Sequence, residues 1–476
     1  MKDNEMKIIG REQEIDRLKY IVESKKPEFV CVYGRRRVGK TFLIKQFFNE
    51  RFSFYATGVP KLNNRRQLSF FKNCLIKYGY QKKGQLNSWL DAFTALIEVL
   101  EQPDVYRLYN GKRIVFIDEA PWMDSPRSDF KAAFDFFWNT WGSTKEDLIL
   151  IVCGSATSWI INNLLTDTGG FYNRVTKQLL IKPFEVREVQ KMLIDKGVHF
   201  SIRETIETYM IFGGIPYYID LFNPLLSLAQ NVEWLFFSKN SELKYEKDVL
   251  LSSLFGKHNI HGLILDTLYT KKSGLTRQEI CEYTKLESSR HVTSALIELE
   301  QCGFIRSFID YKHNKKNAIY QLIDPFILFS FNVLGGNISS WENFIESAKY
   351  HSWSGQSFEI FCLNHIPQIK ETLGITGLST NEYGFKDHRD NKGAQIDLII
   401  DRKDDVINLC EMKYCFGLYT INKDYEENLL KKVEVFKSIV KTRKGIQITF
   451  ITPFGIENNM HSHIVARSIA IKDWLD

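Results

Sequence analysis

The spacing of hydrophobic and polar residues changes along this chain, and each kind of spacing predicts a different element. Apolar runs within 29–33, 113–119 and 148–153 are typical of strands buried on both faces of a parallel sheet. Apolar residues at helical spacing follow the first run, at 42–48. Buried strands alternating with helices predict an α/β fold with a parallel sheet in the first part of the chain.

A glycine-rich stretch separates the first apolar run from the helix that follows it. Residues 34–41 read Gly-Arg-Arg-Arg-Val-Gly-Lys-Thr, which is the GxxxxGKT spacing in its required context of strand, loop and helix. In such a loop, backbone N–H groups and the helix N-terminus surround phosphate, while Lys40 reaches the β- and γ-phosphates and Thr41 binds Mg²⁺. The alternative is a chance glycine turn before a helix. We expect ATP and Mg²⁺ as cofactors, with the nucleotide bound by Gly34, Arg37, Val38, Gly39, Lys40, Thr41 and Phe42.

The ends of the other two apolar runs carry side chains that suit the same chemistry. We expect Asp118, on a strand neighbouring the loop, to hold Mg²⁺ through water, and Glu119 to orient or deprotonate the attacking water. Alone, such a run is often a buried strand with polar residues at its exit. Ser155 could sense the γ-phosphate or cap a helix. Arg174 could reach phosphate in the same or a neighbouring subunit, which would make the protein a homo-oligomer, or could be an ordinary surface arginine.

The middle of the chain predicts three short helices and a hairpin. Apolar residues at 261–269 have helical spacing, and Thr276-Arg277-Gln278-Glu279 has the pattern of a capping box before a second helix. A third helix ends at Cys302-Gly303, where glycine suits a C-terminal cap. The runs 304–306 and 318–322 predict the two strands of a wing. Together these elements predict a winged helix.

The expected DNA contacts of this segment lie on the third helix and on the hairpin turn. Polar residues near a helix start, beside a basic turn, are the groups that phosphate contacts require. The alternative is a packing module whose lysine-rich turn is merely solvated. The residues concerned are Ser288, Ser289, Arg290, His291 and Thr293 on the helix, and Lys312, His313, Lys315 and Lys316 in the turn.

A different pattern follows the glycine- and serine-rich linker at 335–340. Residues 355–366 predict a helix that contains Glu359, and 395–400 and 406–413 predict strands joined by a charged turn. A helix at 424–439 and a strand at 446–452 complete an αβββαβ order. This order predicts a second α/β domain after the linker.

The two predicted strands of this domain carry acidic and basic residues that could act together. Glu411 and Lys413 are two positions apart and so project from one face, and Asp397 lies near the middle of the adjacent strand. Such a set can hold Mg²⁺, with Glu359 as a further ligand or base, while Lys413 steadies the nucleophile or the developing charge. The alternative is a solvated strand edge. The apolar neighbours Leu409, Cys410 and Met412 favour a buried strand, where charges without a purpose would be costly.

Composition and charge indicate an ordinary globular protein and argue against a membrane-spanning or disulfide-rich one. A content of 44% hydrophobic and 25% charged residues is ordinary for a globular protein, and a net charge of +6 permits a nucleic-acid partner without requiring one. Eight cysteines without CxxC spacing indicate reduced, buried thiols rather than metal ligands. Residues 1–5 have no apolar leader, and no stretch is long enough to span a membrane. We expect a cytoplasmic protein with no membrane partner.

Residues 7–235 resemble the prokaryotic P-loop ATPases of the AAA+/STAND-related group, close to archaeal origin-recognition ATPases. The resemblance implies that the entry motif, with Gly10 and Arg11, lies near the adenine, and that 213–216 begins a helical lid. No basic residue at 213–218 takes the place of a lid arginine, which favours a slow switch over a processive motor. The matching residues are Ile9-Gly10-Arg11-Glu12, the motifs at 34–41 and 118–119, Gly154-Ser155, Tyr172-Asn173-Arg174 and Gly213-Gly214-Ile215-Pro216.

Residues 340–470 resemble the PD-(D/E)XK restriction-endonuclease-like superfamily, in the form fused to such ATPases. The likeness rests on Ile396-Asp397, Glu411-Met412-Lys413 and Glu359, with Ile396 in place of the proline that names the motif. That replacement removes no catalytic group. The resemblance implies cleavage of DNA by a Mg²⁺-assisted water, with Glu411 and Lys413 as catalytic residues and Glu359, Asp397 and Glu411 as metal ligands.

The predicted organisation is therefore a P-loop parallel-sheet core at 1–190, a helical lid at 191–255, a winged helix at 256–334 and a restriction-endonuclease-like α/β domain at 341–476. The predicted function is an ATPase coupled to a Mg²⁺-dependent nuclease, with DNA as partner. The alternatives are an ATP-dependent DNA-binding switch with a non-cleaving nuclease fold, and a signalling ATPase with a protein partner.

Overall fold

The computed structural model describes residues 7–102, 108–166, 173–256, 260–287, 290–311, 318–334, 338–386 and 395–475. The chain forms two compact units, which are Met1–Pro183 and Phe184–Asp476. We call them the first and the second unit. None of the helices in the described ranges combines the length and the apolar character needed to cross a membrane.

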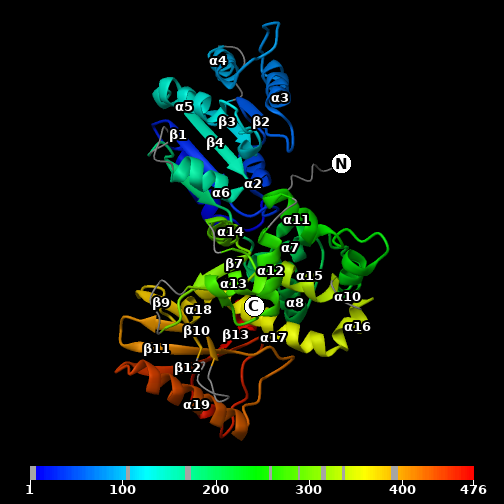
Figure 1. Ribbon diagram of the computed structural model, residues 1–476, viewed down its shortest axis with the longest axis vertical. Helices are drawn as coiled ribbons and strands as arrows, with labels where there is room; N and C mark the ends of the chain where they lie inside the picture. The colour runs from blue at the N-terminus through cyan, green and yellow to red at the C-terminus, as the bar shows by residue number, and fades with distance from the viewer. Residues whose placement is uncertain are drawn as a thin grey trace. The chain divides into compact units, whose positions relative to one another are not determined.

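The first unit is built on a five-stranded parallel sheet, which confirms the predicted α/β fold of this part (Figure 1). The strand order is β2-β3-β4-β1-β5, so β4 lies between β1 and β3. The expectation that Asp118 lies on a strand next to that of the phosphate loop is therefore wrong. Strand order depends on tertiary packing, which apolar runs do not encode. The strands are β1 Glu28–Tyr33, β2 Phe54–Thr57, β3 Arg113–Asp118, β4 Leu148–Gly154 and β5 Lys177–Leu180.

The helices of the first unit cover this sheet and bury an aromatic core. Phe29 of β1 packs edge-on against Phe134 at 5.6 Å, and Phe71 packs against Trp89 and Phe93 at 5.4 and 5.8 Å between ring centroids. Burial of these rings is the main force that fixes the helices on the sheet. The helices are α1 Glu12–Val22, α2 Lys40–Phe47, α3 Asn64–Lys77, α4 Trp89–Leu100, α5 Phe130–Thr140 and α6 Thr157–Ile160, with short 3-10 or π turns at Ala120–Trp122, Gly142–Thr144 and Ile161–Leu165.

The second unit begins with a helical bundle that combines segments far apart in the sequence. Helix α8 packs against α15 and α17, and the hydroxyl of Ser357 donates to the carbonyl of Met210 at 2.7 Å. Phe329 of α15 packs against Phe344 and Trp353 across the linker predicted at 335–340. Residues 335–337 of that linker lie outside the described ranges. The helices are α7 Val186–Asp195, α8 Ile202–Phe212, α9 Pro216–Asp220, α10 Leu228–Val232, α11 Glu246–Phe255, α15 Pro325–Leu334, α16 Trp341–Ile345, α17 Ala348–Asn364 and α18 Ile366–Thr372, with a π turn at Glu233–Phe237.

Three helices and a small sheet form the middle of the second unit. The chain order is α12 Ile260–Thr270, β6 Leu275–Thr276, α13 Arg277–Thr284, α14 Arg290–Gln301, β7 Ile305–Phe308 and β8 Ile319–Leu322. The antiparallel sheet has the order β6-β8-β7. The predicted capping box is confirmed, because the Thr276 hydroxyl accepts from the Glu279 N–H at 3.3 Å and the Glu279 carboxylate accepts from the Thr276 N–H at 2.7 Å.

A mixed five-stranded sheet forms the end of the second unit (Figure 1). Its order is β13-β12-β11-β10-β9, with antiparallel pairs from β9 to β11 and parallel pairs from β11 to β13. Phe436 of α19 packs on Phe385 of β9 at 5.3 Å. The predicted αβββαβ order omitted α18 and β13, and none of the predicted ranges covered β9. The elements are β9 Thr380–Lys386, β10 Gln395–Arg402, β11 Val406–Met412, α19 Lys423–Val440, β12 Gly445–Thr452 and β13 Val465–Ala470, with 3-10 turns at Ser462–Ile464 and Ile471–Trp474.

Candidate functional site

The phosphate-binding loop of the first unit has positive φ angles at three positions, two of which are glycines. Gly34 has φ 138°, and a β-carbon there would lie 2.2 Å from the carbonyl oxygen of Ile181. Gly39 has φ 88° and is the N-cap of α2, and Arg37 between them is also left-handed, with φ 71°. Left-handed residues in such a loop allow backbone N–H groups to turn toward a common point, which is the geometry that cradles a phosphate.

The ammonium of Lys40 lies inside the curve of this loop. Its Nζ donates to the carbonyl oxygens of Gly34 and Arg35, both at 2.9 Å, and the side chain is buried. A buried ammonium is costly unless it is paired, so these bonds hold the charge where a nucleotide phosphate would replace the carbonyls. This position agrees with the predicted role of Lys40, which stays a prediction.

Thr41 and Asp118 come together from α2 and from the end of β3. The Thr41 hydroxyl donates to Asp118 Oδ2 at 2.9 Å. Burial, together with the charge of Glu119, raises the pKa of Asp118, and the hydrogen bond from Thr41 opposes that shift. A hydroxyl and a carboxylate are oxygen donors of the kind that Mg²⁺ prefers, so this pair fits the metal that would accompany ATP.

Glu119 is held by Ser155 of the segment that follows β4. Glu119 Oε2 accepts hydrogen bonds from the Ser155 hydroxyl at 2.9 Å and from the Ser155 N–H at 3.2 Å. The suggestion that Ser155 caps a helix is wrong, because α6 begins later and its N-cap is Ala156. Glu119 itself has φ 47°, and a β-carbon on Gly58 would lie 2.3 Å from its carbonyl oxygen. The carboxylate predicted to activate water is thus fixed by close backbone packing and by one serine.

The remaining residues predicted for the nucleotide site differ in their surroundings. Arg11 is buried, and its Nη2 donates to the carbonyl of Val38 at 3.0 Å, so the entry motif contacts the phosphate loop. Gly10 precedes it with φ 63°. Phe42 is 37% exposed on α2, and Arg174 is exposed. Of the motif around Arg174, residues 169–172 lie outside the described ranges. The roles of these residues at adenine and phosphate stay predictions.

Glu411 of β11 is the centre of an ion-pair network in the second unit. Its Oε1 lies 3.1 Å from the Lys413 ammonium and accepts from the Tyr425 hydroxyl at 2.5 Å, and its Oε2 accepts from Lys432 Nζ at 2.7 Å. Burial alone would raise the pKa of Glu411, but the charges of Lys432 and Lys413 and the hydrogen bonds from Lys432 and Tyr425 outweigh it and lower the pKa. Glu411 is therefore ionised, and both of its oxygens are occupied.

Asp397 and Glu359 lie close to this network and to an arginine from the small sheet. Burial, and then the charge of Asp397, raise the pKa of Glu359, while Lys413 lowers it. Arg306 of β7 donates to the backbone carbonyl of Asp397 at 3.4 Å and to Gln321. Burial lowers the pKa of Arg306 to about 10, against the attraction of Asp397 and Glu359. Asp397 Oδ1 also accepts from Gln395 at 2.7 Å.

The metal-ligand roles expected of Glu359, Asp397 and Glu411 stay predictions. In the described part of the chain, no three acidic, histidine or cysteine side chains gather closely enough to hold a metal ion. Lys413 and Lys432 supply positive charge at Glu411. The side chains are within electrostatic reach of one another, as predicted, and Glu411 forms an ion-pair network with the two lysines.

The predictions missed Tyr425, Lys432 and Arg306 as members of this cluster. Tyr425 and Lys432 are seven residues apart on α19, so they lie on one face of that helix, and this spacing was a usable signal. No comparable signal existed for Arg306, because only the tertiary fold brings this residue of β7 within reach of Asp397 on β10. Of the predicted DNA-contacting residues, Arg290, His291 and Thr293 are exposed on α14, and Thr293 accepts from Arg277 at 2.9 Å. The others, Ser288, Ser289, Lys312, His313, Lys315 and Lys316, lie outside the described ranges.

Comparison with known proteins identifies the first unit more firmly than the second. Residues 8–222 match the model of a family described as an ATPase domain predominantly from Archaea. Together with the loop geometry, this match shows that the chain carries a nucleotide-binding P-loop ATPase domain. The uncharacterized protein MJECL04 of Methanocaldococcus jannaschii is 26% identical over 442 residues, which cover 89% of this chain and 90% of that protein. That similarity therefore extends through both units.

Solved structures show weaker likenesses. The Walker-type ATPase PABY2304 of Pyrococcus abyssi is 18% identical, with a TM-score of 0.45, and the match covers 68% of this chain and 96% of that one. The ORC2 protein of Aeropyrum pernix, solved as ADPNP-ADP complexes, is 14% identical with a TM-score of 0.44 and coverages of 69% and 95%. At these scores neither likeness says what this chain binds or does.

Proposed function

We propose that this protein is an ATP-dependent switch that binds DNA through its second unit. The observation that carries the proposal is the pairing of a P-loop ATPase domain with the element order α12, β6, α13, α14, β7, β8, which is the order of a winged helix. ATP binding or hydrolysis in the first unit would change how the second unit engages DNA.

The ATPase chemistry rests on residues of the first unit. The loop N–H groups and Lys40 would bind the β- and γ-phosphates, and Thr41 and Asp118 would hold Mg²⁺, which neutralises phosphate charge when it is bound with ATP. Glu119 would accept a proton from the attacking water. Ser155 donates two hydrogen bonds to one oxygen of the Glu119 carboxylate, and release of these bonds would free that oxygen to act as the base. Control of these two bonds suits a slow switch.

The DNA contact would be made by α14 as the recognition helix. Val292, Leu296 and Leu299 of this helix are buried where α14 packs against α12 and β7, while Arg290 and His291 are exposed. An arginine near the start of a helix that faces solvent is well placed for phosphate or base contact.

The test is DNA affinity, measured by fluorescence anisotropy with a labelled 30-base-pair duplex and increasing salt. Arg290→Glu should weaken binding at least fivefold, because it replaces an attraction to phosphate by a repulsion. Lys349→Glu on α17 is the matched control, since Lys349 is also an exposed cation at the start of a helix. Equal affinity of both variants and the wild type would remove α14 from the DNA interface. No binding by the wild type would favour a signalling ATPase with a protein partner.

Mg²⁺-dependent DNA cleavage is a second candidate function. It is favoured by the electrostatic coupling of Glu359 to Asp397 and Glu411, and it is opposed by the lysines that occupy Glu411. Incubation of plasmid with Mg²⁺ or Mn²⁺ separates the two cases, with Asp397→Ala compared with the exposed control Glu427→Ala. Nicking that only Asp397→Ala abolishes would establish the nuclease. Equal nicking by all three proteins, or none, would leave the DNA-binding switch.

A further inference from the structure

One segment of the first unit carries positive charge that is not balanced within the segment. Residues 51–90 contain eight Lys and Arg and no Asp or Glu, whereas the formal net charge of the whole chain is only +6. At the chain's overall frequency of acidic residues, about five would be expected in forty positions of a mixed-charge surface. The excess therefore belongs to a particular piece of the fold, which comprises β2, α3 and the approach to α4.

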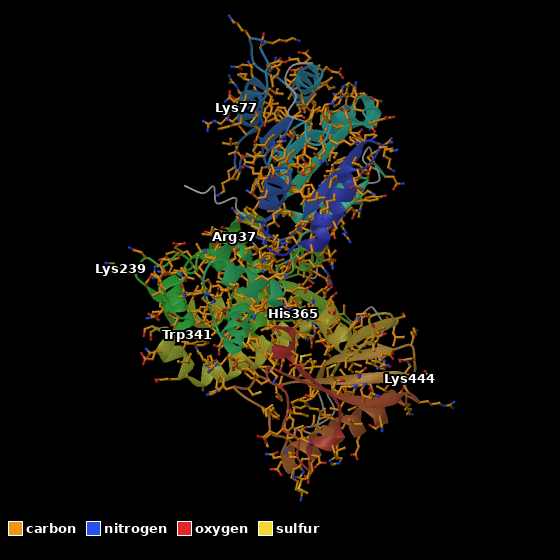
Figure 2. The ribbon with its side chains drawn as sticks, turned by 180° about the vertical axis from the view of Figure 1, so that it is seen from behind. Arg37, Lys77, Lys239, Trp341, His365 and Lys444 are labelled. Carbon is orange, nitrogen blue, oxygen red and sulfur yellow. The ribbon has the colours of Figure 1, made fainter. Side chains whose placement is uncertain are left out.

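Helix α3 divides this segment into a buried and a basic face. Gln67, Leu68, Phe71 and Leu75 are buried, and the three apolar ones belong to the core of the first unit. The opposite face exposes Arg65, Arg66, Phe70, Asn73, Ile76 and Lys77, with Phe70 49% and Ile76 52% exposed. Figure 1 shows α3 beside β2 and α4, and Figure 2 shows Lys77 at the surface of the first unit.

The basic face is not neutralised by its own surroundings. Among the described residues, Arg65, Arg66 and Lys77 make no ion pair with an acidic side chain, and the polar partner of Arg65 is the neutral amide of Gln85 at 3.5 Å. Lys82 is the member of the segment that pairs, with Glu98 at 2.5 Å. The exposed guanidinium and ammonium groups are thus available to an external anion.

The basic stripe of α3 is long enough to lie along several phosphates of a nucleic acid. Arg66, Phe70, Asn73 and Lys77 form one stripe along the helix, at intervals of four, three and four residues. At 1.5 Å per residue the stripe is about 16 Å long, which corresponds to about five base pairs of duplex DNA. A membrane surface fits less well, because the apolar face of α3 is already buried in the core and cannot enter lipid.

We propose that the exposed face of α3, defined by Arg65, Arg66, Phe70 and Lys77, is a DNA-backbone contact surface on the ATPase unit. It is separate from the winged helix and does not depend on α14. The guanidinium and ammonium groups bind phosphates without reading sequence, and Phe70 adds an apolar contact to sugar or to an exposed base.

The test uses the full chain, with the triple variant Arg65→Glu, Arg66→Glu, Lys77→Glu and the same duplex. Binding should weaken at least tenfold, and the slope of log affinity against log salt should fall by about three, one for each lost phosphate contact. The matched control makes the same change of charge elsewhere in the first unit, at exposed Arg17, Lys25 and Lys26, and should bind like the wild type.

The outcomes separate this surface from the winged helix. The α3 surface would be overturned if the α3 variant keeps the wild-type DNA affinity and salt slope while Arg290→Glu loses affinity. The proposed switch would remain intact in that case. Equal losses in the α3 variant and its control would show a general charge effect and would also overturn it. Equal α3-dependent binding to anionic vesicles would identify a membrane contact instead. If the glutamate variant unfolds, judged by thermal melting, glutamine at the same three positions should still lower the salt slope by about three.

Discussion

The imidazole of His365 should make the second unit sensitive to acid. The side chain is fully buried, and its ring packs against Tyr209, Phe361 and Trp474, beside the C-terminal segment (Figure 2). Nδ1 lies 2.7 Å from the carbonyl oxygen of Phe361, to which it donates, and Nε2 accepts from the Val186 N–H at 3.0 Å. A proton on Nε2 would point at that N–H and remove the bond.

The size of the effect follows from the pKa of this group. Burial lowers the pKa of His365 from 6.5 to about 4. Between these values the unfolded chain binds a proton that the folded chain does not, so acid favours unfolding. The contribution of His365 to stability is complete above pH 6.5 and is lost as the pH falls toward 4. The free energy of unfolding should drop by about 2 kcal/mol between pH 7.5 and pH 5 from this residue alone.

Urea unfolding at pH 7.5, 6 and 5, monitored by tryptophan fluorescence, measures this contribution of His365 to the free energy of unfolding. His365→Gln keeps an amide that can both donate and accept but cannot titrate, so it should lower stability at pH 7.5 and show a pH dependence that is weaker by about 2 kcal/mol. Carboxylates that titrate near pH 5 contribute equally to both proteins, and the difference isolates the histidine. A variant with the same pH dependence as the wild type would refute the reasoning.

Three further substitutions test the ATPase site and the bundle. Lys40→Ala should abolish binding of a fluorescent ATP analogue, whereas retained affinity would contradict the role of the loop. Ser155→Ala should raise basal ATP hydrolysis several-fold, because it removes a hydrogen bond of about 1.5–3 kcal/mol from Glu119, and a slower rate would show that Ser155 aligns the base rather than restrains it. Glu207→Gln should destabilise the second unit by about 2 kcal/mol in thermal or urea unfolding, because buried Glu207 accepts bonds from Arg203, Tyr350 and Tyr414. Glu204→Gln, which retains its capping acceptor, should be nearly neutral.

The sequence predicted those parts of the molecule that local spacing determines. A fixed pattern of glycine, lysine and threonine between a strand and a helix identifies the loop at 34–41. The capping box at 276–279 is recognised from only four residues. Glu411 and Lys413 were expected to be neighbours because side chains two positions apart share one face of a strand, and their charged groups lie 3.1 Å apart.

Features that depend on contacts between residues far apart in the sequence could not be predicted from local spacing. The insertion of β4 between β1 and β3, and the approach of Arg306 to Asp397, are set by how elements pack. Lys432, one of the two lysines paired with Glu411, comes from α19, about twenty residues further along the chain, and its pairing depends on how α19 packs on the sheet. Strand β13 was missed because most of its residues are polar or partly exposed.

The proposed switch is tested most directly by DNA affinity in different nucleotide states. We predict that the wild-type protein binds the labelled duplex at least threefold more or less tightly with a slowly hydrolysed ATP analogue than with ADP. The same difference should persist in Glu119→Gln with ATP itself and vanish in Lys40→Ala. Identical affinities of the wild type in both nucleotide states would contradict the claim that the ATPase unit controls the DNA-binding unit.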